Sequence, residues 1–395
     1  MSETNWPEIE ARVYMPTFKR APVTLVRGEG LRVWDDKGRS YLDFIAGVAV
    51  NSLGHCHPVV VEALQKQAAT LIHTSNLYYT IPQLELAELL IRHSCMDKVF
   101  FQNSGAEATE GAVKLARRYG KERLNGAYEV ITASDSFHGR TLAMVAASAQ
   151  PKHQDPYTPL PEGFLNVGWN DVDVIANAIT DKTCAVMLEP VQGESGVRIP
   201  ADDYLRGVRD VCDDRGILLI ADEVQTGVGR LGALFGYELA GIEPDIMTLA
   251  KGLGSGVPIG AFLCKDSANV FKAGDHGSTF AGNPLVCAVG TAVIRYMVEN
   301  DIPGHVQEVG AHLMAHLNQI VAEYPSAREA RGRGLLVALE FDRDVAGDLS
   351  ARCLEKGLLI NPVRANTLRF APPLVASRDD IDEAISILRS VLASV

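Results

Sequence analysis

The amino-acid sequence predicts an α/β protein: a large domain with a mostly parallel sheet and helices on both faces, followed by a smaller α+β domain. From about residue 97, short apolar runs alternate with amphipathic stretches, the pattern of parallel strands joined by helices. From about residue 285, long amphipathic stretches come first and short apolar runs follow, which indicates a separate unit. The chain has 395 residues, 47% of them hydrophobic, and is long enough to fold into both.

The expected elements follow in chain order. Gly30–Val33 and Tyr41–Phe44 flank the turn sequence Asp35–Gly38, so a β-hairpin is predicted there. The strands of the large domain are predicted at Val99–Phe101, Glu129–Thr132, Ala185–Leu188, Leu218–Ala221, Ile246–Leu249 and Gly260–Cys264. Its helices are predicted at 105–120, 139–148, 171–180 and 202–215. Beyond these we expect helices near 284–299, 304–323 and 378–394, and short strands at Gly334–Phe341 and Leu358–Ile360.

Charge and composition exclude several classes of protein. The net charge of −12 argues against nucleic acid and anionic membranes as partners. No run of about 18 apolar residues is present, so no transmembrane helix is expected, and the first residues lack the basic and apolar regions of a signal peptide. The seven cysteines are scattered without a Cys-x-x-Cys pair, which predicts reduced core thiols in a cytoplasmic protein.

Two groups of histidines could suggest a metal. His55 and His57 flank Cys56, but no second cluster completes a metal site, and a turn before Pro58 fits the segment better. His312 and His316 share a helical face but lack the glutamate of the zinc-protease motif, so that face is predicted to be solvated or packed. The sequence therefore predicts no metal site.

Asp222 and Lys251 end two consecutive apolar runs of the predicted sheet. Because buried parallel strands read as continuous apolar runs, both side chains are expected at the carboxyl edge, where open α/β sheets bind ligands. A lysine there can form a Schiff base with an aldehyde cofactor, and an aspartate can keep a pyridine nitrogen protonated. Together they predict pyridoxal phosphate (PLP), whose ring nitrogen needs an acidic partner to act as an electron sink. Single residues at strand ends are usually ordinary surface residues, so the pair needs support from its surroundings.

Three loops could bind the rest of such a cofactor and its substrate. Ser104 can cap a helix, and Gly105 allows a ligand to approach the helix's free N–H groups and positive dipole end. Phe137 could stack on a planar ring, and Arg140 could bind a carboxylate through two hydrogen bonds. The turn-rich segment Gly277–Pro284 could contact phosphate oxygens. Each loop alone could equally be an ordinary cap, a core aromatic beside a surface arginine, or a plain turn.

Six segments resemble, in order, the motifs of the class III PLP-dependent aminotransferases: Asn103–Ala108, Ser136–Thr141, Glu189–Glu194, Asp222–Gly227, Ala250–Gly252 and His276–Pro284. The resemblance extends from the amino-terminal hairpin to Leu368–Leu374, nearly the whole chain. It implies fold type I of the PLP-dependent transferases, with a large PLP-binding domain at 51–284 and a small domain built from 1–50 and 285–395. It also implies a homodimer with shared active sites.

The resemblance also implies roles toward the cofactor. Lys251 forms the covalent link to PLP and moves protons, while Asp222 pairs with the ring nitrogen. Gln225 lies near the ring hydroxyl, and Phe137 stacks on the ring face. The phosphate is assigned to Ser104, Gly105, Ala106 and, from the neighbouring subunit, Thr279.

For the substrates, the resemblance implies two arginines and a mask. Arg140 binds a carboxylate, and Arg369 binds the α-carboxylate of glutamate. Glu194 can pair with Arg369 and mask it, and Ser278 belongs to the substrate site of the partner. Similar members of the family often carry glycine where this chain has Ser195, so the mobility of Glu194 differs to that extent.

Within the family, the Leu53–Pro58 segment and the compact length most resemble the enzymes that transfer the terminal amino group of N2-acetyl-L-ornithine to 2-oxoglutarate in arginine biosynthesis. Succinylornithine, ornithine, N-succinyl-diaminopimelate and 4-aminobutyrate remain alternative donors. The glycines of Gly252–Gly256 suggest a nucleotide-binding protein or dehydrogenase, but their spacing is not Gly-x-Gly-x-x-Gly and Lys251 stands where the loop should begin. A non-catalytic protein on the same fold is disfavoured by the presence of Lys251 and Asp222.

Overall fold

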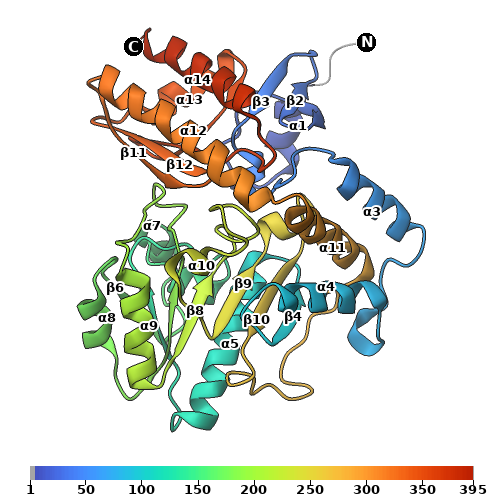
Figure 1. Cartoon of the computed structure of the whole chain (residues 1–395), viewed down its shortest axis with the longest axis vertical. Helices are drawn as coiled ribbons and strands as arrows, with labels where there is room; N and C mark the ends of the chain where they lie inside the picture. The colour runs from blue at the N-terminus through green and yellow to red at the C-terminus, as the bar shows by residue number, and fades with distance from the viewer. Residues whose placement is uncertain (1–4, 395) are drawn as a thin grey trace.

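The computed structural model describes residues 5–394, and a seven-stranded sheet organises the lower half of Figure 1. Its strand order is β4–β10–β9–β8–β7–β5–β6. The strands are β4 (Lys98–Gln102), β5 (Glu129–Ala133), β6 (Phe164–Val167), β7 (Thr183–Leu188), β8 (Leu218–Asp222), β9 (Ile246–Leu249) and β10 (Gly260–Cys264). Neighbouring strands from β6 to β9 run parallel, whereas β10 is antiparallel to both β9 and β4. The predicted mostly parallel sheet is therefore confirmed.

Helices cover both faces of this sheet, because alternate residues of each strand point into two different cores. On β7, Ala185 and Met187 pack with buried residues of α5 (Gly105–Arg123), while Val186 and Leu188 pack with those of α9 (Tyr204–Arg215). Strands β7 to β10 are buried at every position, and for this reason they read as continuous apolar runs. Shorter helices complete the layers: α6 (Leu142–Ala147), α8 (Val172–Ala178) and α10 (Gly236–Ala240).

Two four-stranded sheets lie in the upper half of Figure 1. One has the order β1–β2–β3–β13, from β1 (Leu25–Glu29), β2 (Arg32–Asp35), β3 (Ser40–Asp43) and β13 (Leu358–Leu359), so that both ends of the chain join in it. The other has the order β11–β12–β15–β14, from β11 (Ala327–Arg333), β12 (Leu336–Phe341), β14 (Asn361–Arg364) and β15 (Thr367–Phe370). The long helices are α11 (Pro284–Glu299), α12 (Ile302–Glu323), α13 (Ala346–Glu355) and α14 (Arg378–Leu392). The predicted hairpin is present as β2 and β3, which pair antiparallel.

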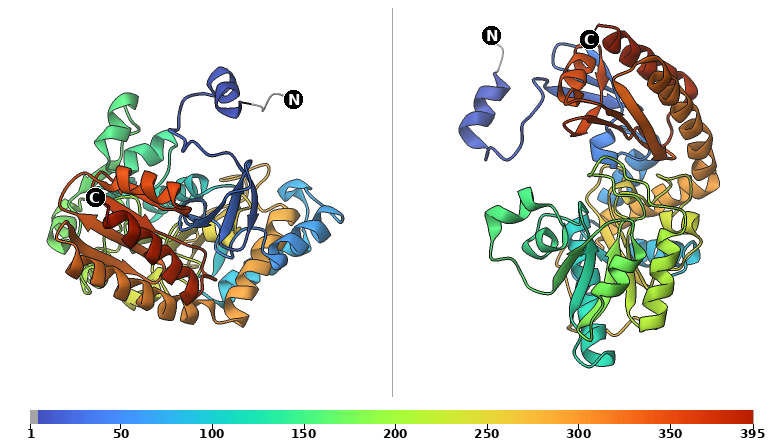
Figure 2. Two further views of the ribbon diagram at one scale, coloured as in Figure 1. Left: turned by 90° about the horizontal axis from the view of Figure 1, so that it is seen from above. Right: turned by 90° about the vertical axis from the view of Figure 1, so that its left-hand side faces the viewer.

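The remaining helices are short or peripheral: α1 (Trp6–Val13), α2 (Ala46–Ala49), α3 (Pro58–Ala68), α4 (Ile81–Arg92) and α7 (Pro151–Gln154), with 3₁₀ turns at Ser75–Leu77, Asp155–Tyr157 and Lys251–Leu253. Helix α1 stands away from the body of the molecule (Figure 2). Every helix in the described chain is too short or too polar to span a lipid bilayer.

The cysteines are only partly as predicted. All seven are free thiols, and five of them are buried, which agrees with core thiols. Cys95 is partly buried and packs against the core, whereas Cys56 is exposed, so the prediction of a core position is wrong for Cys56.

Candidate active site

The site lies at the carboxyl ends of β8 and β9, where one cavity of about 410 Å³ is lined by both Asp222 and Lys251. Asp222 is the last residue of β8 and is only 3% exposed. Lys251 comes two residues after β9 and opens a 3₁₀ turn with a φ of 39°, in the left-handed region that a side chain rarely adopts. Backbone strain of this kind is typical of residues held in place for function.

The cavity keeps the amine of Lys251 easy to deprotonate. Burial lowers the pKa of Lys251, and the charge of Arg369 lowers it further. The carboxylates of Glu194, Asp222 and Glu189 oppose this effect without cancelling it. A lysine with a lowered pKa supplies the free amine that both Schiff-base chemistry and base catalysis need.

Three donors fix the carboxylate of Asp222. His138 Nδ1 lies 2.6 Å from its Oδ2, while Thr248 Oγ1 and the Val224 N–H donate to its Oδ1 at 2.9 and 3.1 Å. Burial alone would lower the pKa of His138, but the hydrogen bond to Asp222, the charge of Asp222 and that of Glu189 raise it. The pKa of His138 is raised as a result, so the imidazole keeps its proton more readily beside Asp222, and the three contacts fix the orientation of the carboxylate.

Glu189 adds a second buried carboxyl beside Asp222. It follows the last residue of β7, lines the cavity, and accepts a hydrogen bond from the Phe137 N–H at 3.1 Å. Burial raises the pKa of Glu189 to about 7, an increase that the charge of Asp222 supports and that of His138 opposes. Sequence reasoning assigned no role to His138 or Glu189. The argument used for Asp222, a polar residue directly after a buried strand, also applies to Glu189.

The loop from β4 to α5 lines the cavity and brings the amino-terminal end of α5 to it. Ser104 caps α5 by accepting a hydrogen bond from the Glu107 N–H at 3.2 Å. The first backbone bond of the helix runs from the Ala108 N–H to Ser104, so the N–H groups of Gly105 and Ala106 lie ahead of the intrahelical ladder. A Cβ at Gly105 would lie 2.8 Å from the Val224 side chain, so this close approach requires glycine.

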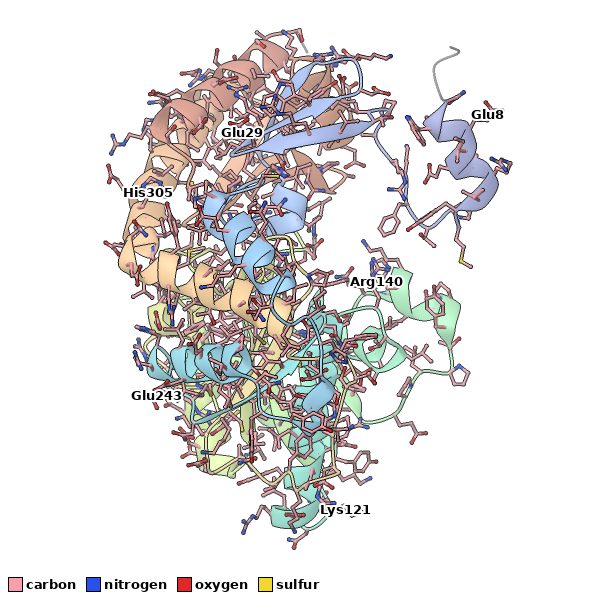
Figure 3. The ribbon with its side chains drawn as sticks, turned by 90° about the vertical axis from the view of Figure 1, so that its right-hand side faces the viewer. Glu8, Glu29, Lys121, Arg140, Glu243 and His305 are labelled. Carbon is pink, nitrogen blue, oxygen red and sulfur yellow. The ribbon has the colours of Figure 1, made fainter. Side chains whose placement is uncertain are left out.

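Phe137 and Arg140 also line the cavity. The guanidinium of Arg140 lies 5.4 Å from the centre of the Phe137 ring, and its Nη1 is 3.3 Å from His153 Nδ1. Burial lowers the pKa of His153, and the charge of Arg140 lowers it further, so the histidine does not compete as a second cation. Arg140 is exposed and accessible to a substrate carboxylate (Figure 3).

Arg369 lies behind Glu194 and does not line the cavity itself. It is 2% exposed on β15, and its Nη1 donates to Glu194 Oε1 at 2.8 Å and to Gln225 Oε1 at 3.3 Å. Gln225 Nε2 in turn donates to Glu194 Oε1 at 3.0 Å. Burial would raise the pKa of Glu194, but the charges of Arg369 and Lys251 and these hydrogen bonds lower it to about 2. Glu194 therefore remains ionised and masks Arg369.

Ser195 anchors the backbone directly after Glu194. Its side chain is buried, and its Oγ donates to Gln192 Oε1 at 3.2 Å. The Ser195 hydroxyl thus attaches this turn to the rest of the loop, while the Glu194 side chain still faces the cavity.

The segment 276–284 lies beside the site without lining it. Ser278 Oγ accepts a hydrogen bond from Asn103 Nδ2 of its own chain at 3.0 Å, and Asn103 lines the cavity. Thr279 is exposed. Of the residues predicted to form the site, nine share the cavity: Ser104, Gly105, Ala106, Phe137, Arg140, Glu194, Asp222, Gln225 and Lys251. Glu194 separates Arg369 from the cavity, and Ser278 and Thr279 do not line it.

A family model, a curated relative and solved structures all match this chain, and all are aminotransferases. A family model described as aminotransferase class-III matches residues 14–392. An acetylornithine aminotransferase of Caldanaerobacter subterraneus subsp. tengcongensis is 50% identical over 98% of this chain and 98% of its own length. A structure of the ornithine aminotransferase of Toxoplasma gondii, described as having partial occupancy of PLP at its active site, matches with a TM-score of 0.94 and 34% identity, covering 99% of this chain and 95% of the other. The acetylornithine aminotransferase of Elizabethkingia anophelis matches with a TM-score of 0.87 and 32% identity over 98% of both chains.

Proposed function

The chain belongs to the class III aminotransferases, and we propose that it moves the terminal amino group of N2-acetyl-L-ornithine to 2-oxoglutarate, giving N-acetyl-L-glutamate 5-semialdehyde and L-glutamate. Curated relatives that are 45–50% identical to this chain are named acetylornithine aminotransferase. These relatives support acetylornithine as the donor, whereas the solved structures of ornithine and acetylornithine aminotransferases, at 30–34% and 32% identity, do not separate the two donors. The reaction would serve arginine biosynthesis.

Class III aminotransferases depend on PLP, and the cavity fits this cofactor. When bound, PLP supplies an aldehyde carbon that takes the amino group and a pyridinium ring that withdraws electrons. The N–H groups at Gly105 and Ala106 would hold its phosphate, Phe137 would cover the ring, and Gln225 would lie near the ring hydroxyl. The buried Asp222 would hold the proton on the ring nitrogen, and its hydrogen-bond donors fix the carboxylate in place for that contact.

Lys251 would carry the protons of the reaction at its Nζ. Its lowered pKa makes the free amine easier to form, so it can take a proton from the substrate carbon and return it elsewhere. The left-handed backbone of Lys251 supports this role, because a strained conformation persists only where the surrounding structure holds the residue, and therefore its side chain, in position.

The buried ion pair between Glu194 and Arg369 carries the choice of substrate. Acetylornithine has one carboxylate and glutamate has two, yet both must react in one cavity. With Arg369 masked, Arg140 is the accessible arginine at the opening and would hold the single carboxylate. With Glu194 displaced, Arg369 would hold the α-carboxylate of glutamate and Arg140 the distal one. A movable ion pair of this kind serves two substrates without a second pocket.

A homodimer would complete the site. Large apolar side chains before and at the start of α4 are exposed: Leu77 82%, Tyr78 70%, Tyr79 94% and Ile81 74%. Asn76 ties this surface to the segment 276–284 by donating to the carbonyls of Ser278 and Ala281 at 3.4 and 3.0 Å. An exposed apolar patch of this extent favours a protein partner. In the cytoplasmic enzyme, a second copy bound to this patch would place Ser278 and Thr279 of one chain close to the cavity of the other chain.

The donor assignment is tested by comparing single-turnover rates of the PLP-loaded enzyme with five donors at equal concentration. We expect acetylornithine to react fastest, ahead of succinylornithine, ornithine, N-succinyl-diaminopimelate and 4-aminobutyrate. Lys251→Ala is the control, and it should show no turnover with any of them. A faster reaction with another donor would replace acetylornithine and leave the aminotransferase assignment intact.

A further inference from the structure

Three metal-ligating side chains meet far from the cavity, on the outer helices of the carboxy-terminal part. His312 and His316 lie four residues apart on α12, so their side chains stack on one face of the helix. Asp382 comes from α14, which packs against α12 (Figure 1). One ligand atom from each of the three lies within 4.8 Å of the others.

The geometry of this His312–His316–Asp382 cluster is convergent. The two Nε2 atoms lie 2.7 and 3.0 Å from the same oxygen, Asp382 Oδ1. The imidazole rings are 4.6 Å apart at an angle of 87°, edge to face, so both direct a nitrogen to one point without clashing. Two neutral imidazoles and one carboxylate are the donor set that zinc uses in open tetrahedral sites.

We propose that the His312–His316–Asp382 cluster binds a divalent transition metal ion, for which zinc is the best fit. Tetrahedral ligands about 2 Å from an ion lie roughly 3.3 Å from one another, so the two N–O separations need to widen by only a few tenths of an ångström. The side chains of His312, His316 and Asp382 are 23%, 26% and 53% exposed, which leaves room for that adjustment, for entry of the ion and for a fourth, water ligand.

Binding changes the protonation pattern of the cluster in a defined way. A neutral histidine that donates from Nε2 to the carboxylate must move its proton to Nδ1, so that the Nε2 lone pair can bind the metal. The carboxylate then exchanges two hydrogen bonds for one metal bond. The ion would join α12 to α14 and stabilise the folded state in proportion to its occupancy.

A second α12–α14 contact supplies a matched control. Arg378 of α14 pairs with Glu308 of α12 at 2.6 Å, and this pair contains no metal-binding histidine. Glu308→Gln removes the charge of that ion pair, weakens the contact between the same helices and leaves the cluster intact. It separates metal binding from a general loosening of the two helices.

The test titrates zinc chloride into the PLP-loaded protein after treatment with a chelator, using calorimetry and thermal unfolding. Wild type and Glu308→Gln should each bind one more zinc ion per chain than His316→Gln or Asp382→Asn, and only the first two should unfold at a higher temperature with zinc. Aminotransferase activity without zinc checks that each variant is folded, and the second cluster variant serves if the first is not. Equal zinc stoichiometry in all four proteins would overturn the proposal and leave the cluster as a hydrogen-bonded link between helices.

Discussion

At the end of β8, the Asp222 carboxylate is held by neighbours from three segments of the chain. His138 comes from the loop after β5, Thr248 from β9, and the Val224 N–H from the turn that follows Asp222 itself. None of these bonds can be read from the spacing of Asp222 and Lys251, because they depend on which strands lie side by side. The residue-level prediction was therefore correct in placing the two groups at one cavity and incomplete in describing what tunes them.

Changing Asp222 to asparagine should retain the cofactor and lose most of the turnover. The amide keeps the shape and can still accept from Thr248, but it cannot hold a proton on the pyridine nitrogen as an anion does. We expect a loss of roughly 10²-fold or more in kcat, as for other preorganised electrostatic contacts. Thr248→Val is the matched control, since it removes one of three donors and keeps the charge; it should lose much less. Rates within a few-fold of wild type for Asp222→Asn would exclude this role.

The raised pKa of Glu189 predicts a dependence of stability on pH. The pKa of Glu189 is about 7 in the folded protein against 4.5 ordinarily, so the folded state binds this proton more tightly. Its contribution to stability is thus complete below about pH 4.5 and is lost as the pH rises through 7. Glu189→Gln still accepts from the Phe137 N–H and should remove up to roughly 3 kcal/mol of that dependence. Urea unfolding of both proteins measures it, and parallel pH profiles would contradict the assignment.

At the scale of elements, the sequence predicted the strands that read as continuous apolar runs and missed strands without such a run. Strands β7 to β10 were predicted because all of their positions are buried and nearly all are apolar. In contrast, β1 and β11 are largely exposed, and β14 contains Pro362, so neither hydrophobic alternation nor composition marks them. The strand that carries Arg369, β15, was missed as well, although Arg369 itself was identified by resemblance.

Capping explains where the helices differ from their predicted limits. Helix α12 begins at Ile302 instead of 304, because the Asp301 side chain accepts from the Gly304 N–H at 3.3 Å and a proline fits the first turn. Helix α6 begins at Leu142 instead of 139, because Thr141 caps it and Gly139 has a φ of 139°. The cap signals were present in the sequence and decide the boundary to within a few residues.

Arg369 lies on β15 and Glu194 lies in the loop after β7. Their ion pair predicts that substitutions affect the two half-reactions differently. Arg369→Ala should remove a few kcal/mol of carboxylate binding from the half-reaction with glutamate, which should slow as a result. The half-reaction with acetylornithine should be affected far less. Glu194→Ala should leave Arg369 exposed and favour glutamate. Single-turnover spectra separate the halves, and equal losses in both for Arg369→Ala would show that the gate does not operate.

The same ion pair should be insensitive to pH in the working range. With the pKa of Glu194 lowered to about 2, the stability that the pair contributes is present above its ordinary pKa of 4.5 and is lost only as the pH falls toward 2. The ratio of the two half-reaction rates should therefore not change through titration of Glu194 at neutral or alkaline pH. We therefore expect a competing carboxylate, and not protonation, to displace Glu194 from Arg369.

At the scale of the whole molecule, the two ends of the chain meet in one sheet. The parallel pairing of β13 with β3 joins a carboxy-terminal segment to the amino-terminal hairpin, above the seven-stranded sheet (Figure 1). We propose on this basis that residues 51–284 form the large domain and that 1–50 with 285–395 form the small one. Closure of one against the other would act on the cavity through Arg369, which the small domain carries.

Shared sites in a dimer predict recovery of activity by mixing. Lys251→Ala lacks the amine, and Thr279→Glu should repel the phosphate of the neighbouring site, so each homodimer should be inactive. A hybrid should contain one site with Lys251 of one chain and Thr279 of the other, both intact. Activity should rise to about a quarter of wild type after random subunit exchange, since half of the dimers are hybrids with one working site. Exchange proven by mass spectrometry without any recovery would show that Thr279 acts within its own chain.

The central claim is that the cavity at the ends of β8 and β9 holds PLP through Lys251. Borohydride reduction of the PLP-loaded protein, followed by digestion and peptide mass spectrometry, tests it most directly. The reduced adduct is expected on the peptide that contains Lys251, and Lys251→Ala should bind PLP without a reducible link. An adduct on any other lysine of the wild-type chain, with Lys251 unmodified, would contradict the assignment of the site.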